Sequence, residues 1–312
     1  MAKRKGDPVH GWLVLNKPPG VTSTKALAIA RRLLNANKAG HAGTLDPLAD
    51  GVLPLAFGEA TKTVPYLVEA RKAYRFTVGW GAETATDDRE GDVTRRSDLR
   101  PAAEAIIRAL PQFIGVILQT PPAYSAVKVD GERAYDLARD GEDVELQPRR
   151  THIHRVELVE AGEGHAVFEM TCGKGTYVRA FARDLGRVLG CLGHVTALTR
   201  LAVGPFSLKS AISLEMLEES AKDGAAKRLL MPLATALDDI PALAVTDQEA
   251  SSLRLGQAIL ARGRVSLRAE AVEGDAPMGV PVYCRSRGGD PVAIATFERG
   301  ELRPSRVFNF SH

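Results

Sequence analysis

Asp46 is the residue of this sequence whose surroundings are best suited to chemistry. It lies within residues 41–53, which read HAGTLDPLADGVL. Here Gly43 and Gly51 permit backbone geometries that other residues resist, and Pro47 fixes φ and removes a donor. A carboxylate in a rigid, partly apolar loop costs free energy unless it is paired or used. Taken alone, the segment favours a surface turn in which Asp46 accepts a hydrogen bond from a backbone amide, so a role for Asp46 depends on the rest of the chain.

A second candidate is the turn Gly173-Lys174-Gly175-Thr176, which looks like a phosphate-binding loop. It lacks the G-x-x-x-x-G-K-[ST] spacing, so the pattern argues against nucleotide hydrolysis. A glycine-rich turn that leads into a helix still offers free backbone amides to a phosphate. The turn is therefore either a contact to a nucleic-acid backbone or an ordinary helix start.

Other catalytic and metal-binding patterns are missing from the sequence. Residues 86–92 are acidic but miss the EF-hand register, and His152 and His154 share a strand face without a carboxylate or cysteine partner. There is no Gly-x-Ser-x-Gly motif, and Asp46 has no second aspartate two residues later. The sequence thus argues against calcium, zinc, serine hydrolase chemistry and an aspartyl-phosphate phosphatase, and it leaves one carboxylate as a nucleophile.

The composition is that of a globular protein in a reducing compartment. The 312 residues suggest about two domains of ~150 residues each, and 45% hydrophobic with 25% charged residues is ordinary. The three cysteines are far apart, the N-terminus lacks the apolar segment of a secretory signal, and no apolar run approaches the ~18 residues of a membrane span. We therefore expect a cytoplasmic protein with no membrane contact and no metal. The net charge of +3 does not by itself indicate nucleic acid.

Several elements must position Asp46. The periodicity of apolar residues predicts strands at 12–16 and 73–81, a helix from Thr22 or Ser23 to about Leu34, a helix at 102–110 and a hairpin of 152–159 with 165–172. A further helix is predicted from about Tyr177 to Leu189. Its apolar stripe contains Val178, Phe181, Ala182, Leu185, Val188 and Leu189, whereas Arg179 and Arg183 fall away from the centre of the stripe.

Two longer stretches differ in character from these elements. Residues 119–150 mix lysine, arginine, aspartate and glutamate and are predicted to be exposed. From residue 241 to 309 the chain has short β-like segments with frequent glycine and proline, so we expect a domain boundary near 235–245.

Six motifs in order carry a resemblance to a known family. They are GWLVLNKPPG (11–20), GHAGTLDPLADGVLP (40–54), GEATK (58–62), KAYR (72–75), PPAYSAVK (121–128) and KGTYVR (174–179). Together they resemble the bacterial TruB family of tRNA pseudouridine-55 synthases, from about residue 10 to 208. The C-terminal part resembles a PUA domain, an RNA-binding pseudo-barrel, with Leu253-x-x-Gly256-x-x-Ile259 as its best local sign.

The resemblance implies an α+β fold. The expected catalytic domain, residues 10–235, has a central mixed, mainly antiparallel sheet flanked by helices and loops, with 119–150 as an exposed, RNA-contacting insertion. A small C-terminal β pseudo-barrel, PUA-like and RNA-binding, would cover 240–309. The implied reaction breaks the N1–C1′ glycosidic bond of one uridine in the T-arm loop of tRNA, turns the base and forms a C5–C1′ bond, without cofactor or metal.

The resemblance also assigns the pocket. Asp46 would be the catalytic nucleophile, with attack at ribose C1′, attack at base C6 and a glycal route all left open. Arg179 would pair with Asp46 and keep it ionised; a cation in the first turn of a helix is otherwise unfavourable. Tyr74 would stack on the target base and move a proton from C2′, although its strand position also fits an ordinary core tyrosine. Tyr177 and Leu198 would line the pocket.

The remaining assignments concern a second carboxylate and the RNA. Asp88 is expected near the active site, in a loop that usually reads Thr-Asp-Thr-x-Asp in the family but has Ala85 in place of the first aspartate. His41 would fill the gap left in the RNA by an extruded nucleotide. Further RNA contacts are expected from four lysines of the motifs: Lys17, Lys62, Lys128 and Lys174.

Three functions remain open for the chain. The first is a monomeric, stand-alone enzyme acting on the T-arm stem-loop of tRNA, for which the short N-terminus and the 119–150 segment argue. The second is a synthase of the same core that depends on a guide RNA, which we do not expect. The third is a protein that binds or folds RNA without catalysis, against which the set of Asp46, Tyr74 and Arg179 argues.

Overall fold

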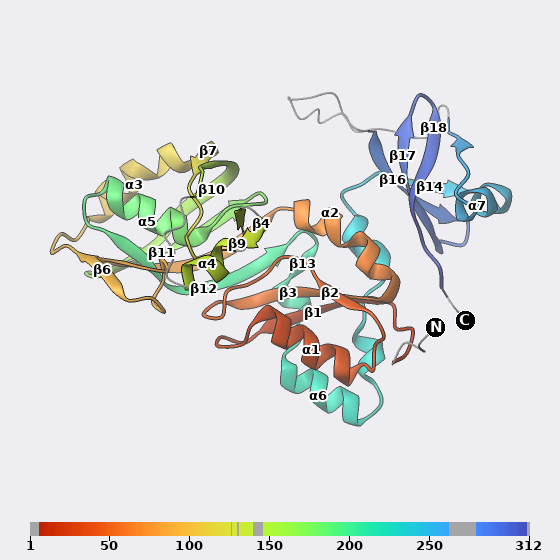
Figure 1. Cartoon of the computed structure of the whole chain (residues 1–312), viewed down its shortest axis with the longest axis horizontal. Coiled ribbons are helices and arrows are strands. Elements are labelled where there is room, and N and C mark those ends of the chain that lie inside the picture. Colours follow the sequence, from red (N-terminus) through yellow and green to blue (C-terminus); the bar gives the residue numbers. More distant parts are fainter. Residues whose placement is uncertain (1–5, 126, 130, 140–145, 262–278, 311–312) are drawn as a thin grey trace.

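A nine-stranded sheet forms the centre of the larger part of the chain (Figure 1). The computed structural model describes residues 6–125, 127–129, 131–139, 146–261 and 279–310. Along the sheet the strands are β1 (Gly11–Lys17), β3 (Asp50–Phe57), β12 (Gly193–Val203), β4 (Lys72–Trp80), β11 (His165–Cys172), β10 (Arg149–Ala161) and β7 (Gly115–Gln119). The short strands β2 (Ala39–His41) and β13 (Phe206–Ser207) pair with β3 and β12. Only β12 and β3 are parallel among these pairs, which confirms the expected mixed, mainly antiparallel sheet.

Helices and loops flank this sheet, as expected for an α+β protein. Two of them, α1 (Ser23–Leu33) and α6 (Leu214–Lys222), contact each other, and α5 (Val178–Val188) packs on β12 and β4. The other helices are α2 (Val64–Glu69), α3 (Ala103–Ala109), α4 (Ala134–Arg139) and α7 (Asp247–Arg254), with 3₁₀ turns η1 (Gly58–Thr63), η2 (Leu110–Phe113), η3 (Leu208–Ser210), η4 (Ala226–Leu229) and η5 (Leu233–Leu237). Among the described residues no helix is long and apolar enough to cross a membrane.

Local sequence explains why strand β4 and helix α1 form. Phe76 and Val78 of β4 are buried while Arg75 is exposed, which is the alternation that predicted this strand. The hydroxyl of Thr22 accepts a hydrogen bond from the amide of Lys25 at 3.1 Å and caps α1. The predicted positions of these elements and of the β10–β11 hairpin are therefore confirmed within a few residues.

Helix α5 departs from its predicted stripe in two respects. Arg179 and Arg183, predicted to lie away from the centre of the stripe, are 5% and 8% exposed, whereas Val188, assigned to the stripe, is 53% exposed. The reason is tertiary: both arginines have ion-pair partners in other loops, and Val188 is the last residue of α5. Membership of Val188 in the apolar stripe was a wrong prediction.

The segment 119–150 is not simply an exposed insertion. It continues from β7 into the hairpin β8 (Lys128–Val129) and β9 (Glu132–Arg133) and then into α4. Val127, Ala134 and Leu146 are buried together and Tyr177 packs against them, while Gln119 is 3% exposed. The prediction of exposure is wrong for these residues, because they pack together against Tyr177, the residue before α5. Residues 126, 130 and 140–145 lie outside the described residues.

A second sheet follows the nine-stranded sheet in the chain (Figure 1). Its strand order is β14 (Ala242–Val245), β16 (Val280–Ser286), β17 (Pro291–Glu298), β18 (Glu301–Val307) and β15 (Ile259–Leu260). Apolar residues of both parts form one cluster, which includes Trp12 and Phe206 from the first sheet, Tyr283 and Ile294 from the second, and Phe308 directly after β18. A smaller two-stranded sheet, β5 (Ala82–Thr84) with β6 (Val93–Arg96), extends beyond β4. The five strands agree with the expected C-terminal β domain.

Candidate active site

Asp46 lies in the loop between β2 and β3, and several groups hold this loop in place. The hydroxyl of Ser23, in the first turn of α1, accepts a hydrogen bond from the Leu45 amide at 2.8 Å and donates to the Leu45 carbonyl at 3.0 Å. Gly43 and Gly51 have φ values of +85° and +99°, as their positions in the motif required. The side chain of Asp46 keeps 34% of its surface exposed, so the carboxylate is fixed at its base and open at its tip.

Arg179 of α5 holds the Asp46 carboxylate with two donors. Its Nε lies 2.9 Å from Oδ2 of Asp46, and its Nη2 donates to Oδ1 at 3.1 Å. This parallel geometry is that of a bidentate arginine–carboxylate pair, which fixes the orientation of both groups. The sequence placed this pair by resemblance, and the structure brings the two residues together.

The remaining donors of Arg179 fix two neighbouring loops. Nη1 donates to the Thr86 carbonyl at 2.8 Å and Nη2 to the Tyr124 carbonyl at 3.0 Å. Asp88 lies 3.6 Å from Nε of Arg179 and accepts hydrogen bonds from the Thr86 hydroxyl and the Glu90 amide. A second, buried carboxylate therefore lies beside the guanidinium but does not replace Asp46 as its closest partner.

Ala85, where the family pattern has aspartate, does not disturb this arrangement. Its side chain is exposed and its amide donates to the Asp92 carbonyl at 2.9 Å. The loop still presents the Thr86 carbonyl and Asp88 to Arg179. Alanine in place of aspartate at position 85 therefore removes only the contacts that an aspartate side chain would make at the surface.

The three predicted wall residues differ in accessibility. Tyr74 on β4 is half-buried, and burial raises the pKa of its phenol, with the nearby Arg200 acting in the opposite direction. Tyr177 directly precedes α5, and the side chain of Gln119 bonds its amide and its carbonyl at 2.8 and 3.1 Å; burial also raises its pKa. Leu198 of β12 is only 7% exposed and belongs to the main core.

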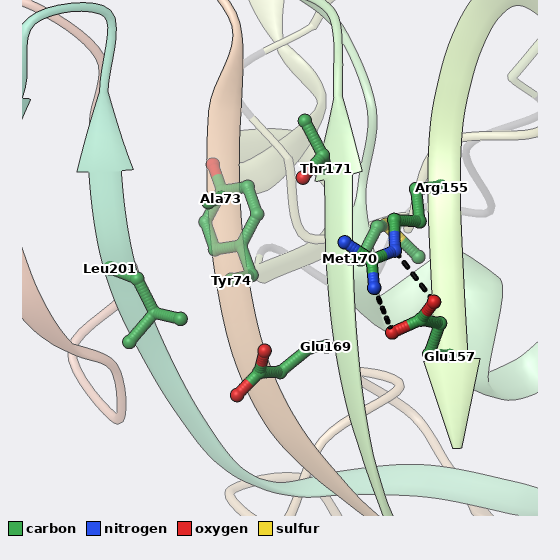
Figure 2. A pocket seen from close by; sticks show the side chains of 8 residues that line it. All are labelled: Ala73, Tyr74, Arg155, Glu157, Glu169, Met170, Thr171 and Leu201. Carbon is green, nitrogen blue, oxygen red and sulfur yellow. Dashed lines mark hydrogen bonds and ion pairs between the residues drawn. The ribbon is translucent and has the colours of Figure 1, made fainter. Parts of the chain in front are cut away.

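A small cavity of about 50 Å³ borders Tyr74 (Figure 2). Its other lining residues come from four strands of the sheet: Ala73, Arg155, Glu157, Glu169, Met170, Thr171 and Leu201. Arg155 and Glu157, two positions apart on β10, lie side by side at one edge of the cavity and form two hydrogen bonds (Figure 2). None of Asp46, Arg179, Tyr177 and Leu198 lines this cavity, so it is separate from the predicted base pocket.

Two of the predicted RNA-binding lysines have other functions. Lys17 is fully buried, and its Nζ donates to the carbonyls of Pro18, Val21 and Pro47 at 3.0, 2.7 and 3.3 Å. It supports the Asp46 loop from below and cannot contact RNA, so that prediction was wrong. Burial lowers its pKa to about 8.

Lys62 is partly buried and also has partners within the protein. Its Nζ lies 2.6 Å from Glu59 and donates to the Val307 carbonyl at 2.7 Å, and Glu59 accepts a hydrogen bond from the Asn309 amide. The ammonium therefore joins η1 to the C-terminal sheet, and its contact with RNA stays a prediction. The sequence did not predict this contact, because Lys62 and Val307 are separated by 245 positions.

The other three RNA-binding predictions concern His41, Lys174 and Lys128. His41 is half-buried at the end of β2, and burial, followed by the charge of Arg200, lowers its pKa. Lys174 is 63% exposed and pairs with Glu69 of α2 at 2.8 Å. Lys128 belongs to β8, but its side chain lies outside the described residues.

Sequence reasoning overlooked Arg200, the largest buried charged side chain next to the Asp46 loop. It lies on β12, two residues after Leu198, and donates to the carbonyls of Val52 and Gly43. An arginine at an inward position of the apolar strand 193–203 is the signal that would have found it. Within the described part of the chain, no group of three or more His, Cys, Asp or Glu side chains is placed to hold a metal ion.

Comparisons with known proteins agree with this geometry. Residues 31–178 match the family described as TruB family pseudouridylate synthase (N terminal domain), and residues 179–238 match the tRNA pseudouridylate synthase B C-terminal domain. A Bradyrhizobium diazoefficiens protein named tRNA pseudouridine synthase B is 55% identical over 309 residues, covering 97% of this chain and 87% of the relative. The Caulobacter vibrioides protein of the same name is 51% identical and covers all of both chains.

Solved structures show the same fold. In the crystal structure of a Cbf5-Nop10-Gar1 complex, one chain aligns with a TM-score of 0.74 and 25% identity, covering 96% of this chain and 84% of that one. A chain of the archaeal box H/ACA sRNP Nop10-Cbf5 complex aligns with a TM-score of 0.73 and 23% identity, covering 99% and 92%. These matches confirm the resemblance carried by the sequence motifs. The chain therefore belongs to the TruB family of pseudouridylate synthases, which are isomerases.

Proposed function

We propose that this protein is a tRNA pseudouridine synthase that isomerises the uridine at position 55, in the T-arm loop of tRNA, with Asp46 as the nucleophile. The relatives that match over nearly the whole chain are named tRNA pseudouridine synthase B, which supports tRNA as the substrate. In the reaction the N1–C1′ bond breaks, the uracil turns, and C5 bonds to C1′. The proton on C5 leaves and N1 gains one, so atoms and charge balance without a cofactor.

One observation carries this proposal: Asp46 and Arg179 form a bidentate pair in which the Asp46 side chain stays partly exposed. Tyr74, on β4, is half-buried. Attack at C1′, attack at C6 and a glycal route each require a charged, oriented carboxylate at the reacting uridine, and this pair supplies it. Tyr74 would stack on the base and Leu198 and Tyr177 would close the pocket around it.

The target uridine must leave its stack to reach Asp46. Extrusion of a nucleotide costs a few kcal/mol and leaves a gap in the RNA loop. His41 lies five residues before Asp46 and is half-buried, so we assign its ring to this gap. Its lowered pKa favours the neutral imidazole, which suits stacking among bases.

The protein would act as a monomer in the cytoplasm and without a guide RNA. The solved relatives of similar fold come from complexes with further proteins, whereas the full-length matches are named for tRNA. Lys174 gives the RNA-binding side an exposed positive charge, whose ion pair with Glu69 lies at the surface, where a phosphate could replace the carboxylate.

One experiment tests the proposal against its alternatives. Purified protein is incubated with a T-arm stem-loop RNA whose uridines carry tritium as the hydrogen on C5. Release of tritium into water is measured. Turnover without added RNA or protein is the expected result. Binding without turnover would favour an RNA-folding protein, and turnover only with a guide RNA and partner proteins would favour the guide-dependent class.

A further inference from the structure

Arg200 is a buried arginine to which the proposed reaction gives no role. It is 1% exposed and lies on β12, between β3 and β4. Its Nε donates to the Val52 carbonyl at 2.7 Å and its Nη2 to the Gly43 carbonyl at 3.0 Å. These two carbonyls lie on either side of Asp46 in the chain, so one planar guanidinium ties together both ends of the loop that carries the nucleophile.

The same side chain also reaches Tyr74. Arg200 and Tyr74 are direct partners across the antiparallel pairing of β12 with β4, and the guanidinium is close enough to the phenol to lower its pKa, against the larger effect of burial. Partners across a sheet point to the same face, so this contact follows from the strand register. Arg200 is therefore joined to the Asp46 loop on one side and to the proposed base-stacking residue on the other.

The backbone of Arg200 adds a third constraint. β12 pairs in parallel with β3 through Arg200 and Gly51, and a Cβ at Gly51 would lie 2.3 Å from the Arg200 carbonyl oxygen. Only glycine allows this approach, and its φ of +99° points to the same requirement. The loop is thus pressed against β12 at the position where Arg200 holds it.

The charge of Arg200 is not neutralised by a close carboxylate. Among the described residues no aspartate or glutamate oxygen lies within 4.0 Å of its guanidinium, and its two hydrogen-bond acceptors are backbone carbonyls. A buried cation of this kind is costly, and neutral donors would suffice to tie two carbonyls. A positive charge beside Tyr74 and the Asp46 loop is therefore better explained by the reaction than by stability.

We propose that Arg200 is a positioning residue of the active site, which holds the Asp46 loop and the hydroxyl of Tyr74 in one fixed geometry. It acts through these two groups and not on the uridine. This inference rests on the proposed roles of Asp46 and Tyr74. Its chemical requirement is the forked, charged guanidinium, because a lysine offers a point charge that cannot span both carbonyls and the phenol.

The test compares R200M and R200K with wild type in single-turnover reactions on the T-arm stem-loop, together with the RNA dissociation constant. R200M should lose about 100-fold in single-turnover rate, as expected for loss of a preorganised electrostatic group, and R200K should recover part of the loss. The dissociation constant should stay within about threefold of wild type, because Arg200 does not face the RNA. Arg75→Met serves as the matched control, since Arg75 neighbours Tyr74 on β4 but is half exposed and pairs with Glu169.

Two further measurements separate positioning from folding. Phe206→Leu weakens the buried cluster on the other side of the sheet, and should lower the melting temperature without lowering the rate. In a double-mutant cycle, R200M with Y74F should lose no more than about the larger single loss, because both act through one contact. If R200M does not fold, the same cycle is run with R200K.

The outcomes distinguish this inference from the proposed function. Strictly additive losses, a rate for R200M within threefold of wild type, or an equal rate loss in F206L would each overturn the role of Arg200. An inactive wild type, or an active Asp46→Asn variant, would overturn the proposed function instead.

Discussion

Asp46 and Arg179 are 133 positions apart in the chain, yet they form a bidentate ion pair at 2.9 and 3.1 Å. Arg179 also bonds the carbonyls of Thr86 and Tyr124, so a single guanidinium joins the loop of Asp46 to two further loops. Because each of the three nitrogens of this guanidinium has at least one partner in the protein, the direction of the Asp46 carboxylate is set before substrate arrives. That preorganisation is the property on which the following predictions depend.

Asp46→Asn should abolish pseudouridine formation on the T-arm stem-loop and leave binding nearly unchanged. The amide is isosteric but is no longer a nucleophile, and its carbonyl oxygen can still accept a hydrogen bond from Arg179. Label release and filter binding measure the two properties. Full activity in D46N would contradict the assignment of Asp46.

Arg179→Lys should reduce the single-turnover rate by about 100-fold or more, since lysine cannot reproduce the bidentate pair together with the two carbonyl contacts. It should also lower stability by about 3 kcal/mol, the order of loss expected when a buried ion pair is broken. Urea unfolding gives the second value. The matched control is Arg155→Lys, an arginine that is 68% exposed and pairs with Glu157. A wild-type rate in R179K would show that the orientation of Asp46 does not depend on the bidentate pair with the guanidinium.

Lys17→Met should change how stability depends on pH. The pKa of Lys17 is lowered by burial from 10.5 to about 8, so between these values the unfolded state binds more protons than the folded state. The free energy of unfolding contributed by Lys17 therefore rises with pH across this window. Relative to K17M, wild type should gain on the order of 1–3 kcal/mol between about pH 7.5 and pH 10. If urea unfolding gave a constant difference in the free energy of unfolding between wild type and K17M across this range, burial would not lower the pKa of Lys17.

Lys62→Met should loosen the C-terminal sheet without changing the chemical step. The ammonium bridges Glu59 and the Val307 carbonyl, so its loss leaves a carboxylate and a carbonyl without that donor. Hydrogen exchange of residues 301–310 should become faster, while the single-turnover rate on the isolated stem-loop stays within about twofold. Unchanged protection of this strand would indicate that the shared apolar cluster alone holds the two parts together.

Lys174→Gln should weaken RNA binding and make it less dependent on salt. If Lys174 contacts one phosphate, the slope of log affinity against log salt should become shallower by about one. Its melting temperature should not change, because both Lys174 and Glu69 are exposed. Glu163→Gln, an exposed turn residue between β10 and β11, is the control for a charge change elsewhere. An identical salt slope would remove Lys174 from the RNA interface.

The sequence alone determined the positions of several elements and the family to which the chain belongs. Period-two alternation defined β4, a threonine cap and apolar spacing defined α1, and the motifs around Asp46, Tyr74 and Arg179 defined the family, which the comparisons confirmed. These features are local: each depends on residues within about one element of one another, so composition and spacing are enough to recognise them.

The tertiary structure decided which charges meet. Lys17, Lys62 and Lys174 carry the same side chain. Lys17 is buried under the Asp46 loop, Lys62 joins η1 to the C-terminal sheet, and Lys174 forms an exposed ion pair with Glu69. Arg200 likewise gained its place from the register of β12 with β4 and β3. The physical reason is that burial and pairing of a charge depend on groups far apart in the chain, and strand register, which one sequence does not reveal, sets their distance.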